Sequence, residues 1–416
     1  MRVLIVSPYL PHAAVGHGGG ISTYHFARQL ARRHEVELLC FCRNGEVERS
    51  QDLESHGVRV QSIHLASPRD PLWRRPSLWL DRSANAILSC LRREPPMVGK
   101  YRRRRMTRAL VRALARFQPD VVQVEFSWLA EYAAAARSWR GVQARPVVGL
   151  NSHEAALLPR QRRLERARGV ARWQRRVDLW LWTQHERRAI VAADWLQCVS
   201  DPDLQCYRQL GADPQRLWHQ PLGVDPERLG AAAAPNPTAP RLLFVGSFDH
   251  EPNRAAARCL ATQIFPELAR RHERLSLDIV GPRPPAWLRR LAAPRLRVHG
   301  FAPDLDPLYD GTSAFVAPLF LGGGIKIKIL EALARGAPVV TTSIGIEGIQ
   351  AHAERELLLA DDVASCIEQT DRLLCDPRLA RELGARARTQ ILERYGWPTL
   401  VDGFERQVQS RWGESA

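Results

Sequence analysis

Short apolar runs alternate with longer amphipathic segments along the first 200 residues of the chain. The runs are rich in Val, Ile and Leu, and they predict strands over residues 3–6, 36–40, 58–63, 121–124, 147–150 and 194–199. Residues 21–33 carry apolar side chains at helical spacing, after a loop over residues 7–20 that is rich in Pro, His and Gly. Strand–helix–strand repetition of this kind predicts a parallel sheet with helices on both faces.

The same alternation starts again after residue 240. Strands are predicted over residues 241–245, 275–280, 296–298, 314–317 and 338–341, and a helix over residues 254–270. The preceding sequence GAAAAPNPTAP has three prolines and few side chains that can anchor a core, which is typical of a linker. The pattern therefore predicts an α/β fold with two facing, doubly wound Rossmann-like domains. Because such sheets bind ligands outside the carboxyl ends of their strands, we expect a cleft between the domains.

The most informative stretch is APLFLGGGIKIKILEALARGAPVVTT, residues 317–342. A strand should end near Pro318, and a helix should run from about residue 325 to 335, where Gly336 provides the C-cap. Three glycines precede this helix, Gly322, Gly323 and Gly324. Glycines let a ligand approach the backbone closely, and the free N–H groups of a helix N-terminus attract an anion.

Two of the three lysines in the chain lie at this predicted helix start. Only 3 of the 60 basic residues are lysine, and two of them are Lys326 and Lys328, expected in the first turn. Positive charge is unfavourable at that end of a helix dipole unless an anion such as a diphosphate binds there. Glu331 follows Lys328 on the same helix face, where its carboxylate can accept hydrogen bonds from ribose hydroxyls. A solvated Lys–Glu pair on a surface helix is the alternative.

In this order and spacing, the motifs resemble those of glycosyltransferase family 4, retaining enzymes with two Rossmann-like domains. The resemblance covers nearly the whole chain and includes the Gly-rich loop with Gly16, PLGVD at 221–225, VGSFDHEPN at 245–253 and SIGIEGI at 343–349. Many family members have a glutamate where this chain has Gly323, and an Arg and a Lys where it has Ser247 and Asn253. The chain is similar to a subgroup with the motif GGG-I-K-x-K-x-x-E, in which the lysines would carry the diphosphate.

The resemblance implies a role for each part of the chain. Residues 1–230 would form the N-terminal acceptor-binding domain, and residues 231–240 the linker. Residues 241–395 would form the C-terminal nucleotide-sugar-binding domain, and residues 396–416 a helix that crosses back to the N-terminal domain.

The resemblance also implies three sets of site residues. The catalytic set would be His153, Lys328 and Glu331, with His153 near the sugar and the acceptor. The donor-binding set would be Gly246, Ser247, Asn253, Gly300, Phe301, Gly322, Gly323, Gly324, Lys326, Lys328 and Glu331. The acceptor or cleft-loop set would be Gly18, Gly19, Gly20, Glu125, Asn151 and Glu154, and Ser127 is a further candidate because it also follows a strand end.

No metal or other cofactor is expected, because the two lysines and the helix N-terminus would stabilise the leaving diphosphate. Two Asp-x-Asp pairs have the spacing of metal-dependent sugar transferases, but each is interpreted as a helix start; the pairs are Asp201 with Asp203 and Asp304 with Asp306. Eight cysteines without a Cys-x-x-Cys pair predict no disulfide framework. Cys40 and Cys42 are expected to be buried in the core.

The net charge of +16 comes from two segments in the first half of the chain. Residues 92–116 hold ten basic residues against one acidic, and residues 160–188 hold ten against three. Arginines there alternate with Trp173, Trp180 and Trp182, which suits an anionic membrane interface. A solvated basic face is the alternative. No apolar run has the length of a membrane span, and the N-terminus is interpreted as a strand, not a signal peptide.

The predicted function is retaining transfer of a hexosyl group from a nucleotide-diphosphate sugar to a glycan or lipid-linked acceptor, in cell-surface polysaccharide or glycolipid synthesis. The predicted location is the cytoplasm, with peripheral attachment at the inner face of the plasma membrane. One alternative is a sugar-nucleotide epimerase of the same architecture, which would need acid–base carboxylates at the site. A basic nucleic-acid-binding protein is the other, but it rests on charge alone, and no nucleic-acid partner is expected.

Overall fold

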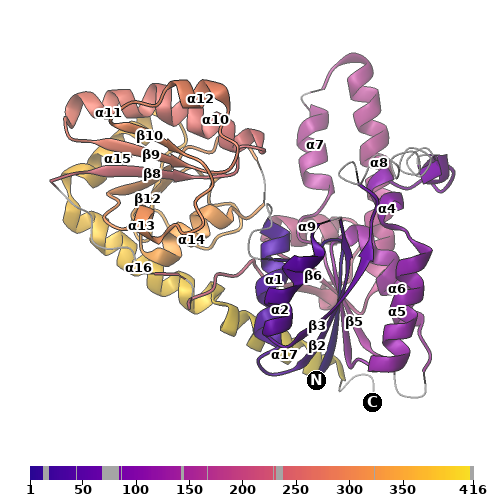
Figure 1. Ribbon diagram of the computed structural model, residues 1–416. Coiled ribbons are helices and arrows are strands. Elements are labelled where there is room, and N and C mark those ends of the chain that lie inside the picture. Colours follow the sequence, from indigo (N-terminus) through magenta and orange to yellow (C-terminus); the bar gives the residue numbers. More distant parts are fainter. Residues whose placement is uncertain are drawn as a thin grey trace. The chain divides into compact units, whose positions relative to one another are not determined.

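The computed structural model describes residues 1–12, 18–43, 45–67, 84–85, 87–141, 145–165, 167–227, 229–230, 238–322 and 324–412. Its internal contacts divide the chain into two compact units (Figure 1). The first unit consists of Met1–Pro221 and Leu400–Ala416, and the second of Leu222–Thr399. Each unit contains one parallel sheet flanked by helices, which confirms the predicted α/β class with two Rossmann-like domains.

The first unit is built on a seven-stranded sheet in the order β3-β2-β1-β4-β5-β6-β7. All six predicted strands are present, and β7 at the edge is an addition that the sequence did not suggest. The strands are β1 (Arg2–Ser7), β2 (Glu35–Cys42), β3 (Val58–His64), β4 (Val121–Glu125), β5 (Val147–Asn151), β6 (Trp195–Cys198) and β7 (Leu217–His219). In the centre, Val3 of β1 lies level with Val36 of β2 and Val121 of β4. Such β-branched, fully buried runs are typical of parallel strands covered on both faces.

Helices cover both faces of this sheet. One face packs against α5 (Arg104–Phe117), α6 (Ala130–Ser138) and the C-terminal half of α8 (Gly169–Ala192). The other face holds α1 (Gly18–Leu30) and α17 (Trp397–Trp412). The remaining helices of the unit are α2 (Gln51–Ser55), α4 (Pro96–Tyr101), α7 (Leu157–Glu165) and α9 (Asp201–Gln209). Among the described helices of the protein, none has the length and apolar content that crossing a bilayer requires.

The second unit is built on a six-stranded sheet in the order β10-β9-β8-β11-β12-β13. The strands are β8 (Arg241–Val245), β9 (Ser276–Val280), β10 (Leu296–His299), β11 (Ala314–Ala317), β12 (Val339–Thr341) and β13 (Leu358–Leu359). The flanking helices are α10 (Glu251–Cys259), α11 (Phe265–Arg271), α12 (Ala286–Arg290), α13 (Asp306–Tyr309), α14 (Ile327–Arg335), α15 (Val363–Cys375) and α16 (Pro377–Tyr395). The sequence predicted five of these strands, and only the two-residue β13 was missed.

Local sequence signals explain where the helices of the second unit begin and end. Asp362 caps α15, since its carboxylate accepts the backbone N–H of Ser365 at 2.7 Å. Gly336 ends α14 in the left-handed conformation, with φ of 78°. Gly384 of α16 packs against the carbonyl of Gly336, where an added Cβ would lie only 2.0 Å from that oxygen. The end of α14 is therefore fixed by backbone contact with α16.

Three predicted helix starts are wrong by a few residues. α1 begins at Gly18, so Gly18, Gly19 and Gly20 form its first turn and are not part of the preceding loop. The helix predicted from residue 254 begins at Glu251 with Pro252 in its first turn, and it includes a π-helical turn over Leu260–Ile264. α14 begins at Ile327, two residues later than predicted.

The boundaries of the units differ from those of the predicted domains. The first unit ends at Pro221, not at residue 230, because Val224 exchanges backbone hydrogen bonds with Tyr395 at 2.8 Å and Trp397 at 3.0 Å. These contacts tie the residues after 221 to the second unit. Of the predicted linker, residues 231–237 lie outside the described part of the chain.

The C-terminal helix α17 completes the core of the first unit. Its Phe404 is fully buried, and the ring lies 5.0 Å from Phe26 of α1 and 6.2 Å from Trp195 of β6, measured between ring centroids. At the surface, Glu405 pairs with His34 at 2.8 Å. Residues from opposite ends of the chain therefore share one core.

We expect Phe404→Ala to destabilise the first unit by about 3–5 kcal/mol, because it removes a fully buried ring and leaves a cavity. Chemical denaturation followed by tryptophan fluorescence measures the change. The matched control is Arg33→Ala, which removes a half-exposed ion pair with Asp402 and should cost under about 1 kcal/mol. Equal losses in the two variants would contradict this account of α17.

Candidate functional site

Loops at the carboxyl ends of four neighbouring strands form the candidate donor site of the second unit. Gly246 follows β8, Gly281 follows β9, Gly300 follows β10, and the glycines at 322–324 follow β11. The loops are held together by backbone hydrogen bonds from Gly246 to Val280 at 2.9 Å and from Gly281 to Gly300 at 3.1 Å. The predicted donor-binding glycines that the structure describes thus lie along one edge of one sheet.

Asn253 is the side chain that connects these loops to α14. Its amide donates to the Ser247 carbonyl at 2.7 Å, and its side-chain oxygen accepts a hydrogen bond from the Lys328 ammonium. Asn253 is buried, and an added Cβ on Gly246 would lie 3.0 Å from its Cγ. Gly246, Ser247 and Lys328, which were predicted separately, are therefore all in contact with Asn253.

The two lysines occupy different positions at the start of α14. Lys326 was expected in the first helical turn, but it is the N-cap residue, with extended backbone at φ −96° and ψ 92°. Its ammonium donates to the Gly324 carbonyl at 2.6 Å and lies 3.6 Å from the Glu347 carboxylate. Lys328 lies in the first turn of the helix, as predicted. The helix dipole disfavours both charges, because its positive end lies here.

Burial and charge repulsion together make Lys328 an unusual lysine. Burial, followed by repulsion from Lys326, lowers the pKa of Lys328 to about 8. The ammonium also lies over the ring of Phe244, 5.9 Å from its centroid. The ring contact stabilises the ammonium only in part, so the burial and the repulsion from Lys326 would favour a negatively charged ligand at this helix start.

Glu331 lies on α14 beyond Lys328, but the two do not pair. Among the described residues, Lys328 makes its hydrogen bond with Asn253 and forms no ion pair with Glu331. The solvated Lys–Glu pair that was the alternative at this helix is therefore absent. Burial raises the pKa of Glu331, and the nearby Arg335 partly offsets the rise.

The other predicted donor-binding residues that the structure describes include an exposed phenylalanine and two glycines with positive φ. Phe301 is 65% exposed, just beyond β10, so its ring is available to a ligand. Gly322 has φ of 121° and Gly324 has φ of 68°, conformations that side chains strongly disfavour. Gly323 lies outside the described residues.

A hydrogen-bonded cluster around Glu125 forms the candidate site of the first unit. Glu125 ends β4, and Asn151 ends the neighbouring strand β5. The Glu125 carboxylate lies 2.5 Å from His153 Nε2 and accepts from Asn151 at 3.1 Å and Thr23 at 3.4 Å. Asn151 in turn accepts the backbone N–H of His153 at 3.0 Å. The carboxylate therefore fixes the orientation of the imidazole.

Backbone strain marks the same place. His153 has φ of 57° and Phe126 has φ of 73°, both unusual for residues other than glycine. Their rings stack on each other with centroids 4.0 Å apart. Gly19 lies against this stack, since an added Cβ would come 2.4 Å from the Phe126 ring and 3.2 Å from His153 Nδ1. His153 Nδ1 is buried and has no hydrogen-bond partner among the described residues, so it can serve a ligand.

Other residues predicted for the acceptor side are placed differently. Glu154 is exposed at the surface, beyond the Glu125 cluster. The Ser127 hydroxyl points inward and donates to buried Glu186 at 2.9 Å, so it is used within the protein. Gly18 and Gly20 lie with Gly19 in the first turn of α1, and Gly16 is outside the described residues.

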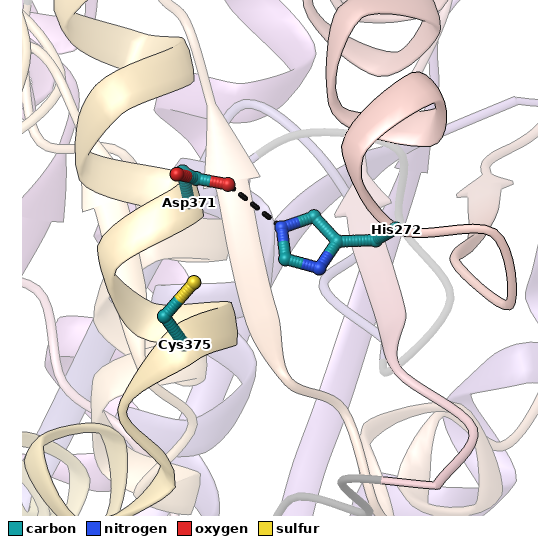
Figure 2. A group of neighbouring side chains, drawn as sticks. All are labelled: His272, Asp371 and Cys375. Atoms are coloured by element: carbon teal, nitrogen blue, oxygen red, sulfur yellow. Dashed lines mark hydrogen bonds and ion pairs between the residues drawn. The ribbon is translucent and has the colours of Figure 1, made fainter.

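The residues with metal-ligand character have partners of their own. Asp203 accepts the backbone N–H of Ala155 at 2.7 Å, and Asp306 pairs with Arg335 at 2.9 Å. Figure 2 shows a third group, in which ligand-type atoms of His272, Asp371 and Cys375 lie within 4.8 Å of one another.

The group in Figure 2 is distant from the candidate donor site. The His272 ring lies 2.7 Å from the Asp371 carboxylate, and Arg271 lies 3.5 Å from the same carboxylate, so Asp371 already has two partners. His272 precedes β9, at the amino end of the strand, whereas Gly281 and the candidate donor residues lie at the carboxyl end. The group therefore has no part in the donor site.

Sequence reasoning missed two residues that the structure places at these sites. Glu347 is the acidic residue of the SIGIEGI motif, and its contact with Lys326 could have been suspected from that charge. Phe126 directly follows Glu125, but its stacking on His153 depends on a left-handed backbone that no sequence signal reveals.

Comparisons with known proteins agree with this geometry. Residues 16–228 match the family model described as Glycosyltransferase Family 4, and residues 239–376 match the model described as Glycosyl transferases group 1. An uncharacterized 44.6 kDa protein in the cps region of Klebsiella pneumoniae is 39% identical over 59 residues, and the match spans 14% of this chain and 15% of that protein.

Solved structures with the same fold cover almost the whole chain. Sucrose-phosphate synthase from Thermosynechococcus elongatus has a TM-score of 0.69 and 16% identity, covering 100% of both chains. Anabaena HepE in complex with UDP and glucose has a TM-score of 0.64 and 12% identity, covering 99% of this chain and 100% of that one. WaaG, a glycosyltransferase involved in lipopolysaccharide biosynthesis, has a TM-score of 0.62 and 14% identity, covering 97% and 98%. At these identities the similarity shows the fold.

We expect Glu125→Ala to destabilise the first unit by about 2–4 kcal/mol, because it leaves the buried donors of Asn151, Thr23 and His153 without their acceptor. Urea unfolding measures the loss. The control is Glu154→Ala, which removes an exposed carboxylate three residues after Asn151 and should change stability by under about 0.5 kcal/mol. A loss below about 1 kcal/mol for Glu125→Ala would show that the carboxylate does not organise this cluster.

Proposed function

Because this chain belongs to the glycosyltransferases of group 1 and family 4, we propose that it transfers a hexosyl group from a nucleotide-diphosphate sugar, with retention of configuration at the anomeric carbon. The acceptor we propose is a glycan or lipid-linked sugar used in cell-surface polysaccharide or glycolipid synthesis. We place the enzyme in the cytoplasm, attached peripherally to the inner face of the plasma membrane. Two similar structures support a nucleotide-sugar donor and a glycolipid setting, since HepE is bound to UDP-glucose and WaaG is involved in lipopolysaccharide biosynthesis.

The observation that carries this proposal is the pair of lysines at the start of α14. Lys328 is held by Asn253, and Lys326 lies beside the glycines that follow β11. Two ammonium groups at the positive end of a helix form a site for a diphosphate, to which the free N–H groups of the first turn would also donate. Glu331, one turn further along the same helix, would accept hydrogen bonds from ribose hydroxyls.

The chemistry proposed for these residues requires no metal ion. As the bond between the anomeric carbon and the diphosphate breaks, negative charge develops on the phosphate oxygens, and Lys326 and Lys328 would stabilise it. His153, whose Nε2–H is held by Glu125, would accept a hydrogen bond from a sugar hydroxyl at Nδ1. The acceptor oxygen would then bond to the anomeric carbon from the face that the diphosphate leaves, which retains the configuration, and the hydroxyl proton would pass to the departing diphosphate.

Lys328→Ala should weaken nucleoside diphosphate binding by about tenfold or more, because a charge-assisted contact to phosphate is lost. In the wild type, affinity should fall as pH rises from 7 to 9, since Lys328 of the free protein loses its proton near pH 8 and only its charged form attracts phosphate. Calorimetric titration with UDP, GDP and ADP measures both effects. Lys100→Ala is the control and should leave affinity and its pH dependence unchanged. A Lys328→Ala variant that binds like the wild type would contradict the proposed donor site.

Transfer and epimerisation are separated by their products. The protein is incubated with UDP-, GDP- or ADP-glucose, with and without a bacterial membrane lipid extract as acceptor, and with EDTA in a parallel series. We expect free nucleoside diphosphate to be released only when the extract is present, at a rate that EDTA does not change and that His153→Ala strongly reduces. A new sugar nucleotide without diphosphate release would instead establish the epimerase, and loss of the rate in EDTA would refute the metal-independent mechanism.

A further inference from the structure

The first unit carries a row of exposed apolar side chains on α8. Val170, Trp173, Val177 and Trp180 are 76%, 67%, 38% and 46% exposed. At about 3.6 residues per turn, their spacing places all four within a stripe roughly 80° wide on one side of the helix. Two large aromatic rings in one exposed row are unusual for a soluble surface and indicate a binding surface.

The charges around this row indicate what it binds. Five arginines on α7 and α8 are exposed, Arg163 on α7, Arg168 at the N-cap of α8, and Arg172, Arg175 and Arg176 on α8 itself. At the same helical spacing Arg176 borders the row and Arg172 lies further around the helix, whereas Arg175 lies on the opposite side. The carboxylate of Asp178, within the same stretch, is already paired with Arg160 at 3.1 Å. Apolar and aromatic groups flanked by arginines match a membrane interface, where acyl chains lie next to anionic headgroups.

The other basic segment of the chain has a different structure. Its main helix, α5, buries its apolar residues against the sheet, including Met106, Leu110 and Leu114. The arginines of α5, such as Arg108 and Arg112, are exposed, but they accompany a helix that has no apolar row to insert. The structure therefore distinguishes α5 from α8, although their segments looked alike in the sequence. The exposed apolar residues just before and at the start of the first segment lie outside α5, and they are Ile87, Leu88, Leu91 and Met97.

The hairpin of α7 and α8 is attached directly to the His153 edge of the first unit. α7 begins at Leu157, four residues after His153, and in Figure 1 the hairpin stands clear of the rest of its unit. The C-terminal half of α8 is anchored in the core by Glu186, whose carboxylate accepts hydrogen bonds from Ser127 at 2.9 Å and from Tyr207 at 2.7 Å. A surface bound by the N-terminal half of α8 would thus be held at a fixed position relative to His153.

We propose that the exposed row on α8 inserts into the interface of an anionic lipid bilayer, while the surrounding arginines contact lipid phosphates. Docking through this hairpin turns the His153 edge of the first unit toward the membrane, where a lipid-linked acceptor is found. Both steps rest on the proposed function: the membrane contact specifies which residues make the peripheral attachment, and the orientation assumes the lipid-linked acceptor. A membrane is favoured over a second copy of the chain because like-charged arginine clusters on two copies would repel each other.

Co-sedimentation with vesicles tests this proposal. The full chain is mixed with vesicles of phosphatidylcholine alone or with added phosphatidylglycerol, and binding should require the anionic lipid. The double variant W173S/W180S should lower the partition coefficient by about tenfold or more, because two interfacial aromatic anchors are lost. R172Q/R176Q should bind more weakly and lose part of its dependence on salt. Circular dichroism melting, unchanged in both variants, verifies that they fold.

Two matched controls keep the result specific. Val47→Ser removes an exposed apolar side chain elsewhere in the first unit, and R108Q/R112Q removes two exposed arginines of α5. Both should bind vesicles within about twofold of the wild type.

Wild-type binding by W173S/W180S would overturn the proposal. So would a dimer, seen by light scattering, that W173S/W180S dissociates, since the row would then be an interface between two copies. Binding of UDP by W173S/W180S, measured in parallel, should equal that of the wild type. A failure of the membrane proposal can therefore be told apart from a failure of the proposed donor site.

Discussion

The donor chemistry proposed for the second unit depends on one constraint, the desolvated ammonium of Lys328 at the positive end of α14. A desolvated cation beside another cation and a helix N-terminus is unfavourable, and the lowered pKa of Lys328 expresses that. The side-chain oxygen of Asn253 and the ring of Phe244 compensate only in part, because neither carries a full negative charge. The remaining imbalance is the physical reason to expect an anionic ligand, and a diphosphate has the charge and the oxygen atoms to relieve it.

Parallel-sheet topology explains how residues from distant parts of the sequence reach this place. In the second unit, Gly246, Gly300 and the start of α14 follow three different strands, and all lie at the same edge of the sheet. The first unit repeats the principle, since Glu125 and Asn151 end neighbouring strands and meet at one carboxylate. The two edges differ in character, because one gathers ammonium groups and glycines and the other a buried imidazole–carboxylate pair. That difference supports donor chemistry at the sheet edge of the second unit. It supports a hydrogen-bonding role toward sugar at the sheet edge of the first unit.

Much of this arrangement was predictable because it rests on short-range patterns. The β-branched runs, the three glycines before α14 and the scarcity of lysine identified the sheets and the donor loops. The details that failed depend on contacts between segments far apart in the sequence. Ser127, for example, faces inward toward Glu186, whereas the N-cap position of Lys326 is a local backbone detail that helical spacing does not specify. The stack of Phe126 on His153 and the difference between the two basic segments likewise appear only when burial is known.

We infer that Lys326 and Lys328 receive the diphosphate of the donor, and the chain allows a direct test because it contains only three lysines. Lysine labelled with ¹⁵N at the side-chain nitrogen gives three NMR signals, assigned by single substitutions and followed during titration with UDP, GDP and ADP. We predict that for one of these nucleotides the Lys326 and Lys328 signals move, that the pKa of Lys328 rises from about 8, and that the Lys100 signal stays fixed. Saturating nucleotide that leaves Lys326 and Lys328 unmoved, or that moves only Lys100, would contradict the account.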